Sequence, residues 1–350
     1  MKKLRIGLVT RRELKGYVFL LPWLIGFVTF FVVPLVQSVW YSLHEVKVTA
    51  SGLKMTWVGW ENYRYLFQSD TVFVEQLSNF FQDSILRLAV ILVFSLVAPK
   101  WMLALALGGL MSVGAYELLE RTGLVREKRL VLYAMIAAFG TAVWSYFGAR
   151  YAVGVLGIIA FCVVLFLEMM RNHVKINFQK IAMTFMGGLI VPYLLCSLIR
   201  IHTMTIGRYV ILIPFIVACI NDTGAYFAGM LFGRHKLAPV ISPKKTIEGA
   251  VGGVLCAMLV MLLYTFVLDV FFGFYVNYAY AMIYGLFGSL VGIFGDLCFS
   301  VIKRQTGIKD YGNLIPGHGG VLDRLDSMVL VGPLMEALLI IIPVAVGKSL

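Results

Sequence analysis

The sequence predicts an all-α, polytopic integral membrane protein with about nine or ten transmembrane helices. Hydrophobic residues make up 60% of the 350 residues and charged residues only 14%. The mean hydropathy is +0.89. A helix needs about 20 mostly apolar residues to cross a bilayer. Apolar runs that could supply such helices lie at about 17–40, 84–98, 101–118, 131–149, 151–169, 181–200, 209–230, 247–273, 277–302 and 327–346.

The basic residues give the chain a net charge of +12, and they cluster beside the apolar runs. A basic chain can bind nucleic acid, but this clustering follows the positive-inside rule, so we expect no nucleic-acid partner. Basic loops lie at about 121–129, 171–180, 234–245 and 303–324, and two predicted spans separate each loop from the next. All four can therefore lie in the cytoplasm. We expect a multi-pass protein of the inner (plasma) membrane whose functional site faces the cytoplasm.

Residues 1–80 differ from the rest of the chain. Basic residues precede the run 17–40, which predicts an uncleaved anchor with a cytoplasmic N-terminus, and a polar, aromatic loop follows. Counting spans forward from that N-terminus places residue 83 outside, whereas counting back from the first basic loop places it inside. Three explanations stay open: the first run does not cross, 84–118 crosses once with a break at Pro99-Lys100, or the N-terminus is inverted. We therefore divide the chain into 1–80, which could be a fused segment, and a membrane domain of 81–350.

The most concentrated polar stretch of the membrane domain is 300–327, between two apolar runs. It contains the sequence PGHGG at 316–320, and glycine lets a backbone approach a ligand closely. If a helix starts after this sequence, Asp323 and Asp326 share one face. Two converging carboxylates favour a bound cation, and their hard oxygen ligands suit Mg²⁺. The alternative is a solvated basic loop, which has no need of such a glycine sequence.

A polar stripe precedes this stretch on a predicted apolar helix. Asp296, Ser300 and Lys303 are spaced at 0, 4 and 7, so they share one helical face. A carboxylate inside a hydrophobic span is costly and usually marks a functional site. The stripe therefore predicts that acid, hydroxyl and amine groups act together.

The stretch from Ser300 through Lys303-Arg304 and Lys309-Asp310 to PGHGG and DRLD closely resembles the signature of the phosphatidate cytidylyltransferases, also called CDP-diacylglycerol synthases. A second block agrees with it: NDTGAY at 221–226, HKLAP at 235–239 and SPKKTIEG at 242–249. The resemblance covers about residues 80–350. It implies a nucleotidyltransferase of phospholipid biosynthesis that joins CTP to phosphatidic acid, giving CDP-diacylglycerol and pyrophosphate. The choice of CTP depends on the resemblance alone.

The resemblance also implies roles for individual residues. Asp296, Asp323 and Asp326 are the strongest candidate metal ligands, whereas Asp222 is a weaker one that could instead turn the backbone at a helix end. The catalytic candidates are Asp296, Lys303, His318, Asp323 and Asp326. The substrate-binding candidates are Asn221, Asp222, Lys244, Lys245, Ser300, Arg304, Lys309 and Arg324. The expected cofactor is Mg²⁺, with room for a second cation, and the expected partners are CTP, phosphatidic acid and the bilayer; a homodimer is allowed.

Two other functions compete with this one. The sequences RRELKGY at 11–17, FLLP at 19–22 and WVGWENY at 57–63 resemble the amino-terminal part of sugar-type ABC transporter permeases. The coupling loop by which such permeases dock on their ATPase is absent from the sequence, so this resemblance predicts no complete transport module. A CDP-alcohol phosphotransferase also handles CDP-lipids, but its Asp-Gly-x-x-Ala-Arg sequence does not occur in this chain.

Overall fold

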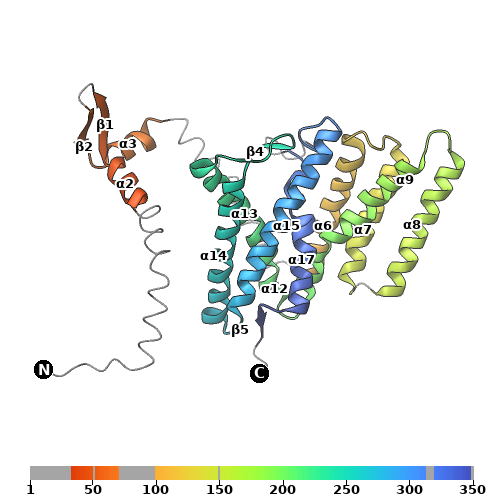
Figure 1. The fold of residues 1–350 in the computed structure, drawn as a ribbon. Coiled ribbons are helices and arrows are strands. Elements are labelled where there is room, and N and C mark those ends of the chain that lie inside the picture. Colours follow the sequence, from red (N-terminus) through yellow and green to blue (C-terminus); the bar gives the residue numbers. More distant parts are fainter. Residues whose placement is uncertain (1–32, 50–51, 71–98, 149, 313–318, 348–350) are drawn as a thin grey trace. The chain divides into compact units, whose positions relative to one another are not determined.

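The computed structural model describes residues 33–49, 52–70, 99–148, 150–312 and 319–347. These residues belong to two compact units, 1–90 and 91–350 (Figure 1). The boundary lies ten residues beyond the division at residue 80 that composition predicts. The part of the predicted anchor before residue 33, the whole predicted span 84–98, and His318 fall outside the described residues.

The first unit holds a β-hairpin between two short helices. The elements are α2 (Val33–Ser42), β1 (His44–Thr49), β2 (Gly52–Trp57) and α3 (Glu61–Gln68). The strands pair antiparallel, with His44 opposite Trp57. The stretch expected as a polar, aromatic loop thus contains two strands and a short helix. The alternation of polar and apolar residues along HEVKVT is typical of a strand.

The second unit is a bundle of helices with two short hairpins. Its helical elements are α6 (Lys100–Tyr116), η3 (Glu117–Arg121), α7 (Lys128–Tyr146), α8 (Tyr151–Arg171), α9 (Phe178–Phe185), η4 (Met186–Ile190), α10 (Val191–Leu195), α11 (Ser197–Thr203), α12 (Gly207–Val210), α13 (Leu212–Phe232), α14 (Ile247–Phe272), α15 (Tyr278–Gln305), α16 (Leu322–Leu325) and α17 (Met328–Ile341). The strands are β3 (Lys236–Ala238), β4 (Ser242–Thr246), β5 (Tyr275–Val276) and β6 (Ala345–Val346), paired β3 with β4 and β5 with β6.

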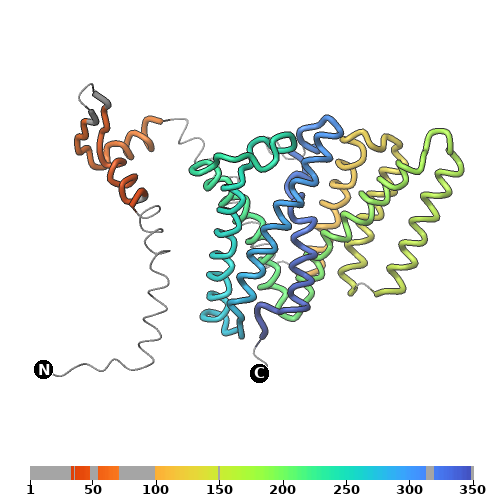
Figure 2. The backbone as a smooth tube through the Cα atoms, in the orientation of Figure 1, coloured from red at the N-terminus to blue at the C-terminus, as the bar shows by residue number. Residues whose placement is uncertain are grey.

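Seven helices within the described residues are long and apolar enough to cross a membrane, which confirms a mostly helical, polytopic protein. The segment from α9 to α11 forms one such span, and its backbone runs on through a π-helical turn (Figure 2). The predicted span 327–346 is wrong in its length, because α17 holds only 14 residues. It ends at Ile341, two residues before Pro343. Proline disfavours the α conformation in the residue before it, which explains this end.

Helices α13 and α14 pack closely because glycine removes side chains from their interface. A Cβ at Gly253 of α14 would lie 2.5 Å from the carbonyl oxygen of Asn221 in α13. A Cβ at Gly224 would lie 2.8 Å from Cys256 Cβ. The two backbones therefore approach each other directly, and this contact fixes where the middle of α13 lies beside its neighbours.

The four basic loops all lie at one end of the bundle, as the spacing of spans predicts (Figure 1). Contacts join them there: Lys180 pairs with Glu127 across the first two loops, and Arg304 Nε donates to the carbonyl of Ile241 at 3.2 Å across the last two. The polar sequence blocks at 235–249 and 300–327 therefore meet at this basic end.

Candidate active site

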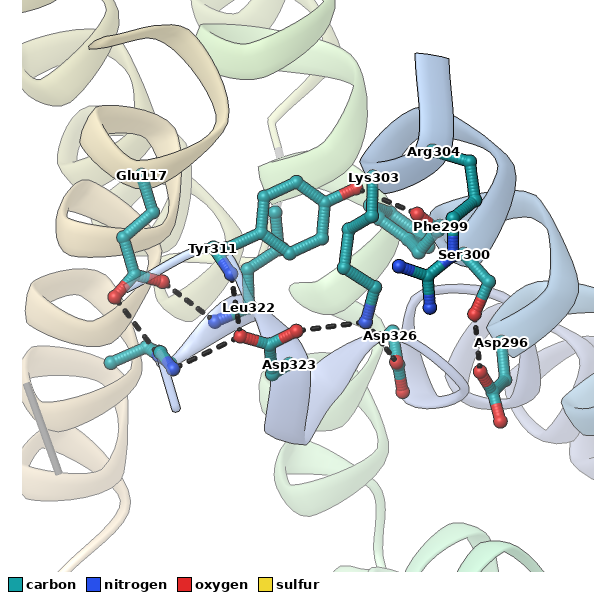
Figure 3. Close-up of polar contacts among 12 residues, drawn as sticks. Glu117, Asp296, Phe299, Ser300, Lys303, Arg304, Tyr311, Leu322, Asp323 and Asp326 are labelled. Carbon is teal, nitrogen blue, oxygen red and sulfur yellow. Dashed lines mark hydrogen bonds and ion pairs between the residues drawn. The ribbon is translucent and has the colours of Figure 1, made fainter. Parts of the chain in front are cut away.

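The last turns of α15 carry the predicted polar stripe (Figure 3). Ser300 Oγ donates to Asp296 Oδ1 at 3.2 Å, which shows that the two side chains share a face. Lys245, from β4, donates to the other carboxylate oxygen of Asp296. The β3–β4 hairpin thus places the ammonium group of Lys245 against α15, although the two residues are 51 positions apart in the chain.

Lys303 lies one turn further along α15 and is buried, with a side-chain exposure of 11%. Its Nζ donates to Asp323 Oδ1 at 2.8 Å and lies 4.0 Å from Asp326 Oδ2. The ammonium also lies 5.4 Å from the centre of the Tyr311 ring. Lys303 therefore connects α15 to both acids of the DRLD sequence (Figure 3).

Asp323 holds the loop that precedes it. Its Oδ2 accepts from the backbone N–H of Tyr311 at 2.7 Å and of Gly320 at 3.0 Å. Tyr311 in turn donates from its hydroxyl to the carbonyl of Phe299 at 2.9 Å. Burial, with the nearby charge of Asp323, raises the pKa of the Tyr311 phenol, so this group stays a donor. Both oxygens of Asp323 are thus engaged by this chain's own groups.

Asp326 is less constrained. Its Oδ1 accepts from the N–H of Ser327 at 2.8 Å, and its side chain is 14% exposed. Burial raises the pKa of Asp326, and the negative charge of Asp296 adds to the effect, with a smaller contribution from Asp222. The negative charges of these three carboxylates therefore repel one another, and a bound cation would relieve this repulsion.

The donors present fit a hard divalent cation such as Mg²⁺, because they are carboxylate oxygens. Within the part of the chain that the structure describes, no three acidic, histidine or cysteine side chains are close enough together to hold a metal ion. Lysine ammonium groups contact Asp296 and Asp323 instead. Asp326, whose Oδ2 accepts no hydrogen bond from the described residues, is favoured as a ligand. Both oxygens of Asp296 accept hydrogen bonds, from Ser300 and from Lys245, so a cation there would take the place of the Lys245 ammonium. Asp323, a predicted ligand, has the contacts of a residue that positions the loop.

The other predicted residues fall into three groups. Asn221 is buried, at 2% exposure, and a Cβ at Gly253 would lie 2.8 Å from its Oδ1, so its side chain packs against α14. Asp222, the next residue of α13, is exposed. The cations Lys244, Arg304, Lys309 and Arg324 are exposed at the basic end of the bundle. The roles proposed for all these residues stay predictions, as does that of His318.

The structure adds one acid that sequence reasoning missed. Glu117 lies in the π-helical turn at the end of α6 and is 3% exposed. Its carboxylate accepts from the backbone N–H of Val321 at 3.1 Å and of Leu322 at 2.9 Å (Figure 3). The available signal was an acid at the end of an apolar run, since a carboxylate in such a place usually has a dedicated partner.

Comparison with known proteins finds relatives of this chain. The phosphatidate cytidylyltransferase of Staphylococcus haemolyticus (strain JCSC1435) is 46% identical over 138 residues, which is 39% of this chain and 52% of the relative. The protein of the same name from Staphylococcus aureus (strain COL) is 45% identical over 139 residues, with 40% of this chain and 52% of the relative covered. The chain thus spans about half the length of the curated relatives that it matches. Over residues 83–342, which carry every described group of the site, the chain belongs to the cytidylyltransferase family.

Proposed function

We propose that this protein is a CTP:phosphatidate cytidylyltransferase, which forms CDP-diacylglycerol and pyrophosphate from CTP and phosphatidic acid. The observation that carries the proposal is the meeting of Asp296 and Asp326 with Lys245 and Lys303 at the basic end of a membrane bundle. The family match and the relatives' names support it. Acids for a cation and amines for phosphate are what two anionic substrates require.

The reaction is a displacement at phosphorus. An oxygen of the lipid phosphate forms a bond to the α-phosphorus of CTP, and the bond from that phosphorus to the bridging oxygen of the β-phosphate breaks, releasing pyrophosphate. The lipid phosphate is already ionised, so no protein nucleophile is needed and no general base is required. Positioning and charge stabilisation are the main contributions in such reactions.

Asp296 and Asp326, with Asp222 nearby, would hold Mg²⁺, which when bound neutralises charge on phosphoryl oxygens. Lys303 and Lys245 place ammonium groups beside these acids, where they can bind phosphate oxygens. Ser300 orients Asp296 through its hydrogen bond. His318 remains a candidate for contact with a phosphate.

The location of the site suits one water-soluble and one lipid substrate. Lys303 and Asp323 lie where the last turns of α15 meet the polar segment that follows, so a nucleotide can arrive from water and a headgroup from the bilayer. By the positive-inside rule we assign this end to the cytoplasmic face of the inner membrane. The surrounding basic loops attract both anions.

The test uses the whole protein in detergent with CTP labelled at its α-phosphate, phosphatidic acid and Mg²⁺. Transfer of the label into the lipid phase is the expected result, and folded protein that transfers none would overturn the proposal. Supplying CDP-diacylglycerol and an alcohol instead tests the rival CDP-alcohol phosphotransferase, for which release of CMP would be the positive result. The carboxylate variant Asp326→Asn provides the inactive control, and Glu120→Gln, in the same unit but without a described side-chain contact to the site, provides the active one.

A further inference from the structure

The Glu117 carboxylate fits into a space that two glycines leave open. A Cβ at Gly320 would lie 2.6 Å from both oxygens of Glu117, and a Cβ at Gly312 would also collide with Oε1. Neither glycine has a positive φ, so backbone conformation does not explain why glycine occupies these positions. Glycine is needed there because any side chain would enter the space of the Glu117 carboxylate. Gly312 precedes the PGHGG sequence and Gly320 is its last residue, and the Glu117 carboxylate lies against both glycines.

Two carboxylates hold the same turn of backbone from different directions. Gly320 N–H donates to Asp323 Oδ2 at 3.0 Å, whereas the next two N–H groups, of Val321 and Leu322, donate to Glu117. The other oxygen of Asp323 is bound by Lys303 of α15. The turn is thus fixed to α6 on one side and to α15 on the other. Any shift at Val321 must move Asp323 and, three residues later, Asp326.

The local structure of α6 presents the acid at the right place. A π-helical turn covers Glu117–Arg121, and such turns are rare and frequent at functional sites. Glu117 sits at its first position, with its side chain directed to the turn before α16 (Figure 3). Glu120 belongs to the same π-helical turn but is only half-buried, and no described contact of its side chain reaches that turn.

We propose that Glu117 is a positioning residue of the active site: it fixes the turn at 320–322 against α6 and thereby sets where Asp323 and Asp326 lie. This inference rests on the proposed function, because it assigns those aspartates to substrate and cation binding. Glu117 itself touches backbone N–H groups and not the reacting atoms. Its effect on turnover is therefore indirect, through the geometry of the acids.

The first experiment compares Glu117→Gln with Glu120→Gln in the full-length protein. Glutamine keeps the size of the side chain but turns one acceptor into an N–H₂ group that faces a backbone N–H, so one hydrogen bond must be lost. We expect amide hydrogen exchange in residues 319–327 to rise, kcat to fall about 10–100-fold, and the Mg²⁺ concentration for half-maximal activity to rise. The Glu120→Gln protein should match the wild type in all three measurements.

Two outcomes would overturn the proposal. Unchanged exchange in Glu117→Gln would show that the carboxylate does not hold the turn. Faster exchange with unchanged kcat and Mg²⁺ requirement would show that the turn does not set the acids. The exchange measurement needs no substrate, so it still decides whether Glu117 holds the turn if the wild-type protein fails to transfer label from CTP. That failure would count against the proposed function alone.

A second pair of variants covers the case in which Glu117→Gln does not fold. Gly320→Ala places a methyl group against the same carboxylate, and Glu117→Ala removes the group that it would meet. Because both substitutions disrupt the same contact, we expect the double variant to have neither slower turnover nor faster amide exchange than Gly320→Ala alone. Losses that multiply independently in the double variant would contradict the proposal.

Discussion

Lys303 Nζ lies 2.8 Å from Asp323 but 4.0 Å from Asp326, so two acids three residues apart have different surroundings. Asp323 is bound by the ammonium and by two backbone N–H groups. Asp326 accepts only from the N–H of Ser327 among the described hydrogen bonds. The first acid organises its loop, and the second retains oxygens for a ligand.

The pairing of Lys303 with Asp323 predicts a specific pattern of stability. Lys303→Met leaves Asp323 buried without its cation, which should cost about 3–5 kcal/mol. In Lys303→Met/Asp323→Asn, the amide oxygen can still accept from the N–H groups of Tyr311 and Gly320, and no unpaired negative charge is left buried. The double variant should therefore be more stable than Lys303→Met. Thermal unfolding in detergent measures this, and fully additive losses would refute the pairing.

Substitution of Asp323 and of Asp326 should affect thermal stability differently. Asp326→Asn should lose turnover with its Tm nearly unchanged, because few internal contacts depend on the charge. Asp323→Asn should lose turnover and also several degrees of Tm, since it breaks the buried pair. Activity assays paired with thermal unfolding check this. Near-normal activity of Asp326→Asn at high Mg²⁺ would remove that residue from the cation site.

A second buried ion pair joins α11 to α17. Arg200 Nε and one terminal nitrogen donate to the two oxygens of Glu336 at 2.6 and 2.7 Å, and both side chains are about 15% exposed. Glu336→Gln should therefore lower the free energy of unfolding by about 3–5 kcal/mol. Glu45→Gln, at the exposed pair of β1, is the control and should leave thermal unfolding unchanged. Equal effects of the two substitutions would mean that the buried pair is not formed.

The pair of Glu127 and Lys180 predicts a pH dependence. Burial acts to raise the pKa of Glu127, but the hydrogen bond from Lys180 and backbone contacts outweigh it, so this pKa lies below its usual 4.5. A carboxyl whose pKa is lowered by folding stabilises the protein above its unfolded-state pKa and loses that contribution as the pH falls through the folded-state pKa. The stability advantage of the wild type over Lys180→Met should therefore shrink on acidification from about pH 6 to about pH 3.

Thermal unfolding of both proteins across that range measures the effect. Glu127→Gln removes the titrating group, so its stability should depend on pH as weakly as that of Lys180→Met. A difference between wild type and Lys180→Met that stays constant with pH would contradict the assigned pair.

Residues 1–80 should be dispensable for nucleotidyl transfer. The family match begins at residue 83, and residues 1–90 form a unit of their own. Deleting residues 1 to 78 should leave the rate of transfer, per mole of inserted protein, within about twofold of the wild type, because the described site residues all follow residue 99. Loss of activity with intact membrane insertion would show that the deleted residues take part.

Much of the bundle could be predicted from the sequence because a bilayer leaves a long apolar segment few options. Runs predicted at 247–273 and 277–302 became α14 and α15 with ends within three residues, since a lipid-exposed backbone must satisfy its own hydrogen bonds. The stripe of Asp296, Ser300 and Lys303 followed from helical periodicity alone. The spacing of basic loops predicted correctly that they gather at one end.

Other features depend on contacts that periodicity does not encode. Asn221 and Asp222 look equivalent in the sequence, but neighbouring residues of a helix point about 100° apart, and only Asp222 is exposed. The different surroundings of Asp323 and Asp326 depend on how the preceding loop folds back. Glu117 meets its partner across 204 residues, a separation that no motif spacing reveals.

That separation has a consequence for synthesis. Glu117 leaves the ribosome long before Val321, so its carboxylate lacks these partners while six further spans of the described residues are made. A chain that ends before Val321 lacks the two N–H groups that donate to the Glu117 carboxylate, and burying an unpaired charge is costly. We therefore expect copies that end before Val321 to be less stable than the full-length chain.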